Sequence, residues 1–88
     1  MTTIKLKKSI HHGTEEIQEL KFRKPVAKDL RNFDLSDLNK FFKIQELSAI
    51  LCGLPLSVLD NLEMEDLVSC ARVIASFLPN SQETFDNT

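Results

Sequence analysis

The residues of this 88-residue chain whose types could carry out chemistry do not form a recognisable catalytic or metal-binding pattern. The two histidines, His11 and His12, are adjacent, so on a strand they point to opposite faces, and two ligands alone do not make a metal site. The two cysteines, Cys52 and Cys70, are far apart in the chain and have no histidine nearby. This pattern predicts two reduced, partly buried thiols, with a disulfide as the alternative.

The acidic and hydroxyl residues also lack a catalytic arrangement. Glu63, Glu65 and Asp66 lie close together, but we expect them in the first turn of a helix, where the helix dipole favours carboxylates. No serine lies in a Gly-x-Ser-x-Gly motif, and the two glycines, Gly13 and Gly53, are too far apart to form a phosphate-binding loop. The sequence therefore predicts a protein that is not an enzyme and that needs no cofactor or metal.

The elements that must position these side chains are predicted to form one small domain. Apolar residues make up 42% of the chain, which is enough for one modest core and too much for a disordered chain. No apolar run approaches the roughly 20 residues that span a bilayer, and the N-terminal residues do not form the apolar core of a signal peptide. We expect a single domain over residues 1–79 and a flexible tail over residues 80–88, in the cytoplasm and away from membranes.

The N-terminal residues predict a β-hairpin over residues 3–23. Apolar residues at alternate positions define its inner face: Ile4, Leu6 and Ile10 on the first strand, and Leu20 and Phe22 on the second. Gly13 supplies the positive φ of the turn, and Lys8 interrupts the alternation as expected near a strand end or an edge. Because a lone hairpin is barely stable in water, its apolar face must lie on the helices or pair with another chain.

The remainder of the domain, residues 26–78, is predicted to be helical. Spacings of three and four between apolar residues place helices over residues 26–32, 35–52, 55–61 and 63–78. Asp34 is the expected N-cap of the second helix, with Ser36 as a rival, and Gly53 and Pro55 suit its end and the start of the next helix. The predicted fold is α+β, an N-terminal β-hairpin packed on a small bundle of three to four helices.

Charge is distributed unevenly along the chain. Residues 1–43 hold ten basic and six acidic residues, a net charge of +4, and residues 44–88 hold one basic and seven acidic residues, a net charge of −6. A basic N-terminal half is compatible with nucleic-acid binding. The interleaved acidic residues and the absence of Tyr and Trp favour a solvated strand face instead. The charge difference also suggests head-to-tail contact between copies of the chain.

One predicted helix carries a wider apolar arc than a core requires, and exposed apolar patches mark interaction sites. We therefore predict a partner-binding surface on this helix, with two hairpin residues as a weaker set: Phe41, Phe42, Ile44, Leu47, Leu20 and Phe22. A small domain that has no catalytic residues and exposes an apolar helix is typical of an interaction module.

Three segments have an order and spacing that match a known pattern. Residues 17–25, IQELKFRKP, followed by Asp29 and Leu30, match leucine, x, hydrophobic, arginine, x, proline and then aspartate-leucine. Residues 51–62 match the second part of the pattern, which is a hydrophobic residue, any residue, glycine-leucine-proline and a later leucine. The third part begins with acidic residues, as in residues 65–67, and ends with phenylalanine-leucine, as in residues 73–78. Over residues 3–78 the chain thus resembles the small tail assembly chaperones of Mu-like long-tailed bacteriophages, of the E, 41 or 14 type.

This resemblance implies a function without catalysis. Such proteins bind the tape-measure protein in the bacterial cytoplasm, keep it soluble, help tail-tube subunits assemble around it, and are absent from the finished virion. Helix-in-groove docking is a suitable mechanism, and several copies along one tape-measure protein add avidity. The expected partners are therefore the tape-measure protein, the tail-tube protein and copies of the chain itself. Two alternatives stay open: a small nucleic-acid-binding regulator that uses the basic hairpin, and a structural subunit of the tail or virion.

Overall fold

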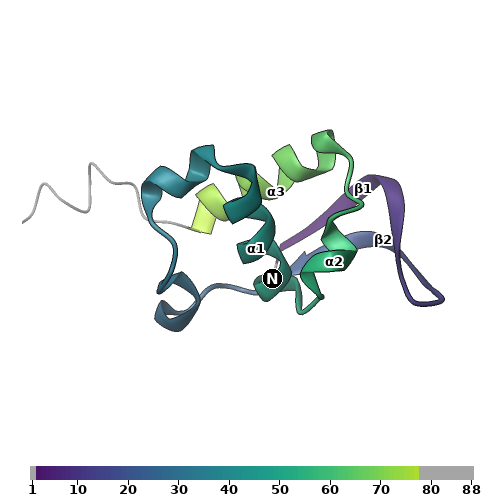
Figure 1. The fold of residues 1–88 in the computed structure, drawn as a ribbon, viewed down its shortest axis with the longest axis horizontal. Helices are drawn as coiled ribbons and strands as arrows, with labels where there is room; N and C mark the ends of the chain where they lie inside the picture. Colours follow the sequence, from purple (N-terminus) through teal and green to yellow (C-terminus); the bar gives the residue numbers. More distant parts are fainter. Residues whose placement is uncertain (1, 78–88) are drawn as a thin grey trace, which may run out of the picture.

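The computed structural model describes residues 2–77, the side chain of Leu35 excepted, and shows a hairpin followed by helices (Figure 1). The elements, in chain order, are β1 (Thr2–His12), β2 (Glu15–Phe22), the 3-10 helices η1 (Ala27–Leu30) and η2 (Leu35–Asn39), α1 (Phe41–Cys52), α2 (Leu56–Leu59) and α3 (Met64–Phe77). β1 and β2 form a two-stranded antiparallel sheet. The predicted α+β fold is confirmed, and the predicted tail over residues 80–88 lies outside the described residues.

The hairpin contains a tight turn and a bulge. Gly13, in the turn, has a φ of 66°, in the left-handed region that glycine adopts without strain. On β1, Lys5 pairs with Glu19 and Ile10 pairs with Ile17, so β1 has more residues than β2 in this interval and bulges. Lys8, which interrupts the apolar alternation in the sequence, lies in this bulge.

The core lies between the inner face of the hairpin and the helices. α3 packs on β1, and α1 packs on β2 and on α3. The largest buried side chains come from the hairpin and from all three α-helices: Phe22, Leu20, Ile44, Leu59 and Ile74. The apolar face of the hairpin is therefore covered by helices of its own chain, the first of the two arrangements expected from the sequence.

The helix predicted over residues 35–52 is in fact two elements, so that prediction is wrong. The cap is confirmed, because the Asp34 carboxylate accepts a hydrogen bond from the Ser36 N–H at 2.9 Å and η2 starts there. Lys40 then has extended backbone angles, φ −113° and ψ 107°, before α1 begins at Phe41. This break turns the chain, so that Leu38 of η2 and Ile44 of α1 both pack into the core.

The ends of the later helices follow the sequence signals closely. α1 ends at Gly53, which has a φ of 69° and donates its N–H to the Ile50 carbonyl at 3.3 Å. Pro55 immediately precedes α2. α3 starts one residue after the predicted Glu63, and the predicted end of this helix at Leu78 lies outside the described residues.

Candidate functional site

The structure divides the six predicted partner-surface residues into two groups. Phe41 and Phe42, in the first turn of α1, are 45% and 61% exposed. The other four are at most 3% exposed and belong to the core: Ile44, Leu47, Leu20 and Phe22. Ile44 and Leu47 are buried because α1 turns one side toward the hairpin and α3. Leu20 and Phe22 are buried because they lie on β2, on which α1 packs. Partner binding stays a prediction, and only Phe41 and Phe42 present a large exposed side chain for it.

A third exposed apolar residue of α1 was not predicted for this surface. This residue is Ile50, which is 48% exposed although it lies next to the buried Leu51 and three positions after the buried Leu47. Phe42, Glu46 and Ile50 are four residues apart, so they lie along one line of the helix surface, which we call the α1 outer ridge. Glu46, which is exposed and lies between Phe42 and Ile50 on this line, is the signal in the sequence that indicates an exposed position for Ile50.

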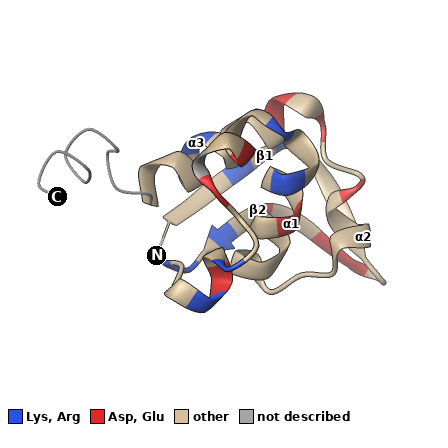
Figure 2. Cartoon of the chain, turned by 60° about the vertical axis from the view of Figure 1, so that its left-hand side comes forward, with Lys and Arg blue, Asp and Glu red and all other residues tan. Residues whose placement is uncertain are grey.

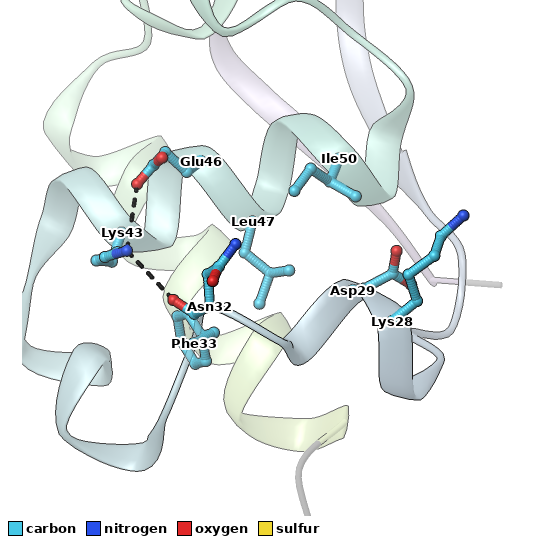
Figure 3. Close-up of a pocket in the computed structure, with 8 residues that line it drawn as sticks. All are labelled: Lys28, Asp29, Asn32, Phe33, Lys43, Glu46, Leu47 and Ile50. Carbon is cyan, nitrogen blue, oxygen red and sulfur yellow. Dashed lines mark hydrogen bonds and ion pairs between the residues drawn. The ribbon is translucent and has the colours of Figure 1, made fainter.

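A groove of about 270 Å³ lies beside the α1 outer ridge, between α1 and the segment around η1 (Figure 3). Phe33, Leu47 and Ile50 supply its apolar lining. Its polar lining comes from both sides of the groove: Lys28, Asp29, Asn32, Lys43 and Glu46. Small-molecule sites usually occupy about 300–1,000 Å³, so this groove suits one or two apolar side chains of a partner better than a cofactor.

Asp29 is neutralised where it borders the groove. Arg23 donates two hydrogen bonds to its carboxylate, at 2.7 and 3.0 Å, and the Val26 N–H donates a third at 2.9 Å. The hydrogen bonds from Arg23, followed by the bond from Val26, lower the pKa of Asp29 to about 2. Asp29 is therefore ionised at neutral pH, and its charge is already matched within the chain.

The opposite wall of the groove is held by Lys43. Its Nζ donates to the Asn32 carbonyl oxygen at 3.2 Å and lies 3.8 Å from Glu46 Oε1 (Figure 3). Lys28, in contrast, is exposed and forms no ion pair with the residues that the structure describes. With Asp29 and Glu46 both paired, the border of the groove favours an acidic partner.

The basic hairpin is engaged within its own chain. Basic and acidic positions occur on both the hairpin and the helices (Figure 2). Lys7 pairs with Glu65, and Lys8 Nζ lies 3.7 Å from Glu63 Oε1. Asp66, only 1% exposed, accepts hydrogen bonds from the Lys7 N–H at 2.9 Å and the Lys8 N–H at 3.4 Å. Part of the charge difference between the two halves is thus used inside the fold, which reduces what the hairpin can offer to nucleic acid or to another copy.

The groups considered for catalysis do not form a reactive site in the described part of the chain. Within residues 2–77 no three His, Cys, Asp or Glu side chains lie close enough to hold a metal ion. Cys52 and Cys70 are both free, and burial raises the pKa of Cys52 to about 12 and that of Cys70 to about 11. Both are therefore thiols at neutral pH and poor nucleophiles.

None of the helices within residues 2–77 combines the length and the apolar character needed to cross a bilayer.

A protein-family model matches residues 3–79, which is most of the chain. The family is described as phage tail assembly chaperone proteins, E, or 41 or 14. The chain belongs to this family. No curated protein and no solved structure matches it. As a member of the phage tail assembly chaperone family, the protein has a role in tail assembly that involves protein partners, and the family suggests that this role is not enzymatic.

The residues that carry the likeness to tail assembly chaperones stabilise the fold. Arg23 and Asp29 form the ion pair beside η1, and Gly53 ends α1 in the left-handed conformation. Leu20 and Phe22 are buried in the core. The pattern therefore identifies the scaffold of a tail assembly chaperone, whereas Phe42 and Ile50, which are exposed, do not belong to it.

Proposed function

We propose that this protein binds the tape-measure protein non-covalently during tail assembly and keeps it soluble until tail-tube subunits surround it. Membership of the tail assembly chaperone family supports the role in assembly. The observation that carries the binding proposal is the pair of exposed apolar side chains on the α1 outer ridge, Phe42 and Ile50, beside a groove with an apolar floor. We place this activity in the cytoplasm of the bacterial host, and we propose that the protein is absent from the finished virion.

The proposed mechanism is docking of an amphipathic helix. Phe42 and Ile50 are eight residues apart, about 12 Å along α1, so the ridge can contact two turns of a partner helix. One apolar side chain of that helix enters the groove over Leu47, and its neighbour one turn away packs on Phe42. A contact of this size is weak alone, so several copies bound along one tape-measure protein supply the avidity.

The test is co-expression with the tape-measure protein encoded in the same gene cluster. The tagged chain should co-purify that protein and increase its soluble fraction. The double variant Phe42→Gln and Ile50→Gln should reduce the co-purified amount at least tenfold, because truncating buried apolar contacts at an interface removes most of its affinity. Glutamine is a good helix former, so α1 should persist, which circular dichroism checks.

The matched control is Met64→Gln, which replaces another exposed apolar residue, at the start of α3 and away from the groove. It should co-purify the tape-measure protein as the wild type does. The proposal fails if the wild type captures no tape-measure protein, or if the control loses as much binding as the double variant. Presence of the chain in purified particles would favour the structural-subunit alternative.

A further inference from the structure

We propose that the groove beside α1 is a binding site for the C-terminal segment of the same chain, with Phe85 on the apolar floor and Glu83 and Asp86 near the basic border. The groove would then be occupied by its own chain until a partner displaces that segment. This last consequence rests on the proposed function, whereas the binding of the segment does not.

The groove defines the chemistry of its ligand. Leu47 is buried and Phe33 is half-buried beneath it, and Ile50 exposes about half of its surface alongside. A floor of this kind in a volume of about 270 Å³ accepts one large apolar side chain. Because the charges of Asp29 and Glu46 are matched within the chain, Lys28, which forms no ion pair within residues 2–77, favours carboxylates next to that side chain.

The sequence after α3 has this composition. Residues 78–88, LPNSQETFDNT, contain one aromatic residue, Phe85, and two acidic residues, Glu83 and Asp86, and no basic residue. The acidic residues lie two positions before and one position after the aromatic one. An apolar side chain flanked by carboxylates is the ligand class that the groove favours.

The segment is also long enough to reach the groove. Phe85 follows Phe77, the last residue of α3, by eight positions, which span at most about 26–29 Å when extended. α3 packs on α1, whose 12 residues are about 18 Å long. Binding within one chain has an effective concentration in the millimolar range for a short linker, so a weak contact is sufficient to populate the bound state.

The test is methyl NMR spectroscopy of the full chain. Phe85→Ala should shift the methyl signals of Leu47 and Ile50, because they lose the ring current of the phenylalanine, and should leave the signals of Val58, on α2, in place. Asn87→Ala is the matched control in the same segment and should shift none of them. Lys28→Glu and 0.5 M salt should each move the Leu47 and Ile50 signals part of the way toward their Phe85→Ala positions.

Two results would overturn the inference. One is a Phe85→Ala spectrum in which Leu47 and Ile50 move no more than in the Asn87→Ala control. The other is a dependence of the wild-type signals on protein concentration, which would make a second copy the occupant. Neither measurement contains the tape-measure protein, so it can fail while the co-purification succeeds. If both proposals hold, the Phe85→Ala chain should capture more tape-measure protein than the wild type.

Discussion

At the scale of single residues, Asp66 links two elements that are far apart in the sequence. Its buried carboxylate accepts hydrogen bonds from the N–H groups of Lys7 and Lys8, which lie in the β1 bulge. Asp66→Ala should destabilise the fold by about 1–3 kcal/mol, because it leaves two part-buried backbone N–H donors without their acceptor. The midpoint of urea unfolding measures this loss.

Glu65→Ala is the control for Asp66. It removes the neighbouring carboxylate, whose pair with Lys7 is exposed to solvent on both sides, so its effect should be much smaller. Equal losses for the two variants would contradict the role given to the bulge.

Asp29 makes the stability of the fold depend on pH in the acid range. In the folded chain its pKa is about 2, below its ordinary value of 3.8, chiefly because of the hydrogen bonds from Arg23. The stabilisation of the fold by ionised Asp29 is therefore complete above pH 4 and is lost as the pH falls from about 4 to about 2. Between these values the unfolding midpoint of the wild type should fall more steeply than that of Asp29→Asn. Parallel curves would show that the Arg23–Asp29 pair does not contribute.

The sequence did not reveal these residue roles. It placed Asp66 in the first turn of a helix, which is correct, but the acceptor role depends on a bulge brought there from the start of the chain. The same limit applies to the predicted partner surface. α1 carries apolar residues on both its buried and its exposed side, and the positions of the hairpin and α3 decide that Ile44 is buried while Phe42 is exposed.

At the scale of elements, local signals predicted most of the secondary structure. The hairpin follows from alternation around Gly13, and the end of α1 follows from Gly53. The break at Lys40 has no such signal, since neither proline nor glycine lies near it. It arises because Leu38 and Ile44 must both reach the core, which is a requirement of packing and not of helix propensity.

The end of α1 provides a test at this scale. Gly53 has a positive φ, and a Cβ added to it would meet no atom within 4 Å. Gly53→Ala should therefore cost only the backbone strain, about 1–2 kcal/mol, and Gly53→Asn should cost less because asparagine tolerates this conformation. Thermal unfolding of the two variants gives the comparison. Equal stability of wild type and Gly53→Ala would exclude strain as the reason for glycine here.

At the scale of the whole molecule, the uneven charge along the chain becomes a set of contacts within it. Lys7 and Lys8 from the basic half meet Glu65 and Glu63 from the acidic half, where α3 begins beside β1. The sequence shows that the charges are separated but not that the fold brings them together. Likewise it led to the correct family, because the matching residues hold the scaffold, whereas Glu46 is the one residue of the exposed ridge whose polarity indicates exposure.

The hydrogen bond from Lys7 to Asp66 joins residues 59 positions apart, and it has a consequence for the order of events during synthesis. A bacterial ribosome adds about 5–20 residues per second, so Asp66 is made roughly 3–12 s after Lys7. Throughout that interval the bulge of β1 lacks the carboxylate of Asp66, and the inner face of β1 lacks the cover of α3. The first strand is therefore synthesised 59 residues before the contact that fixes its bulge can form.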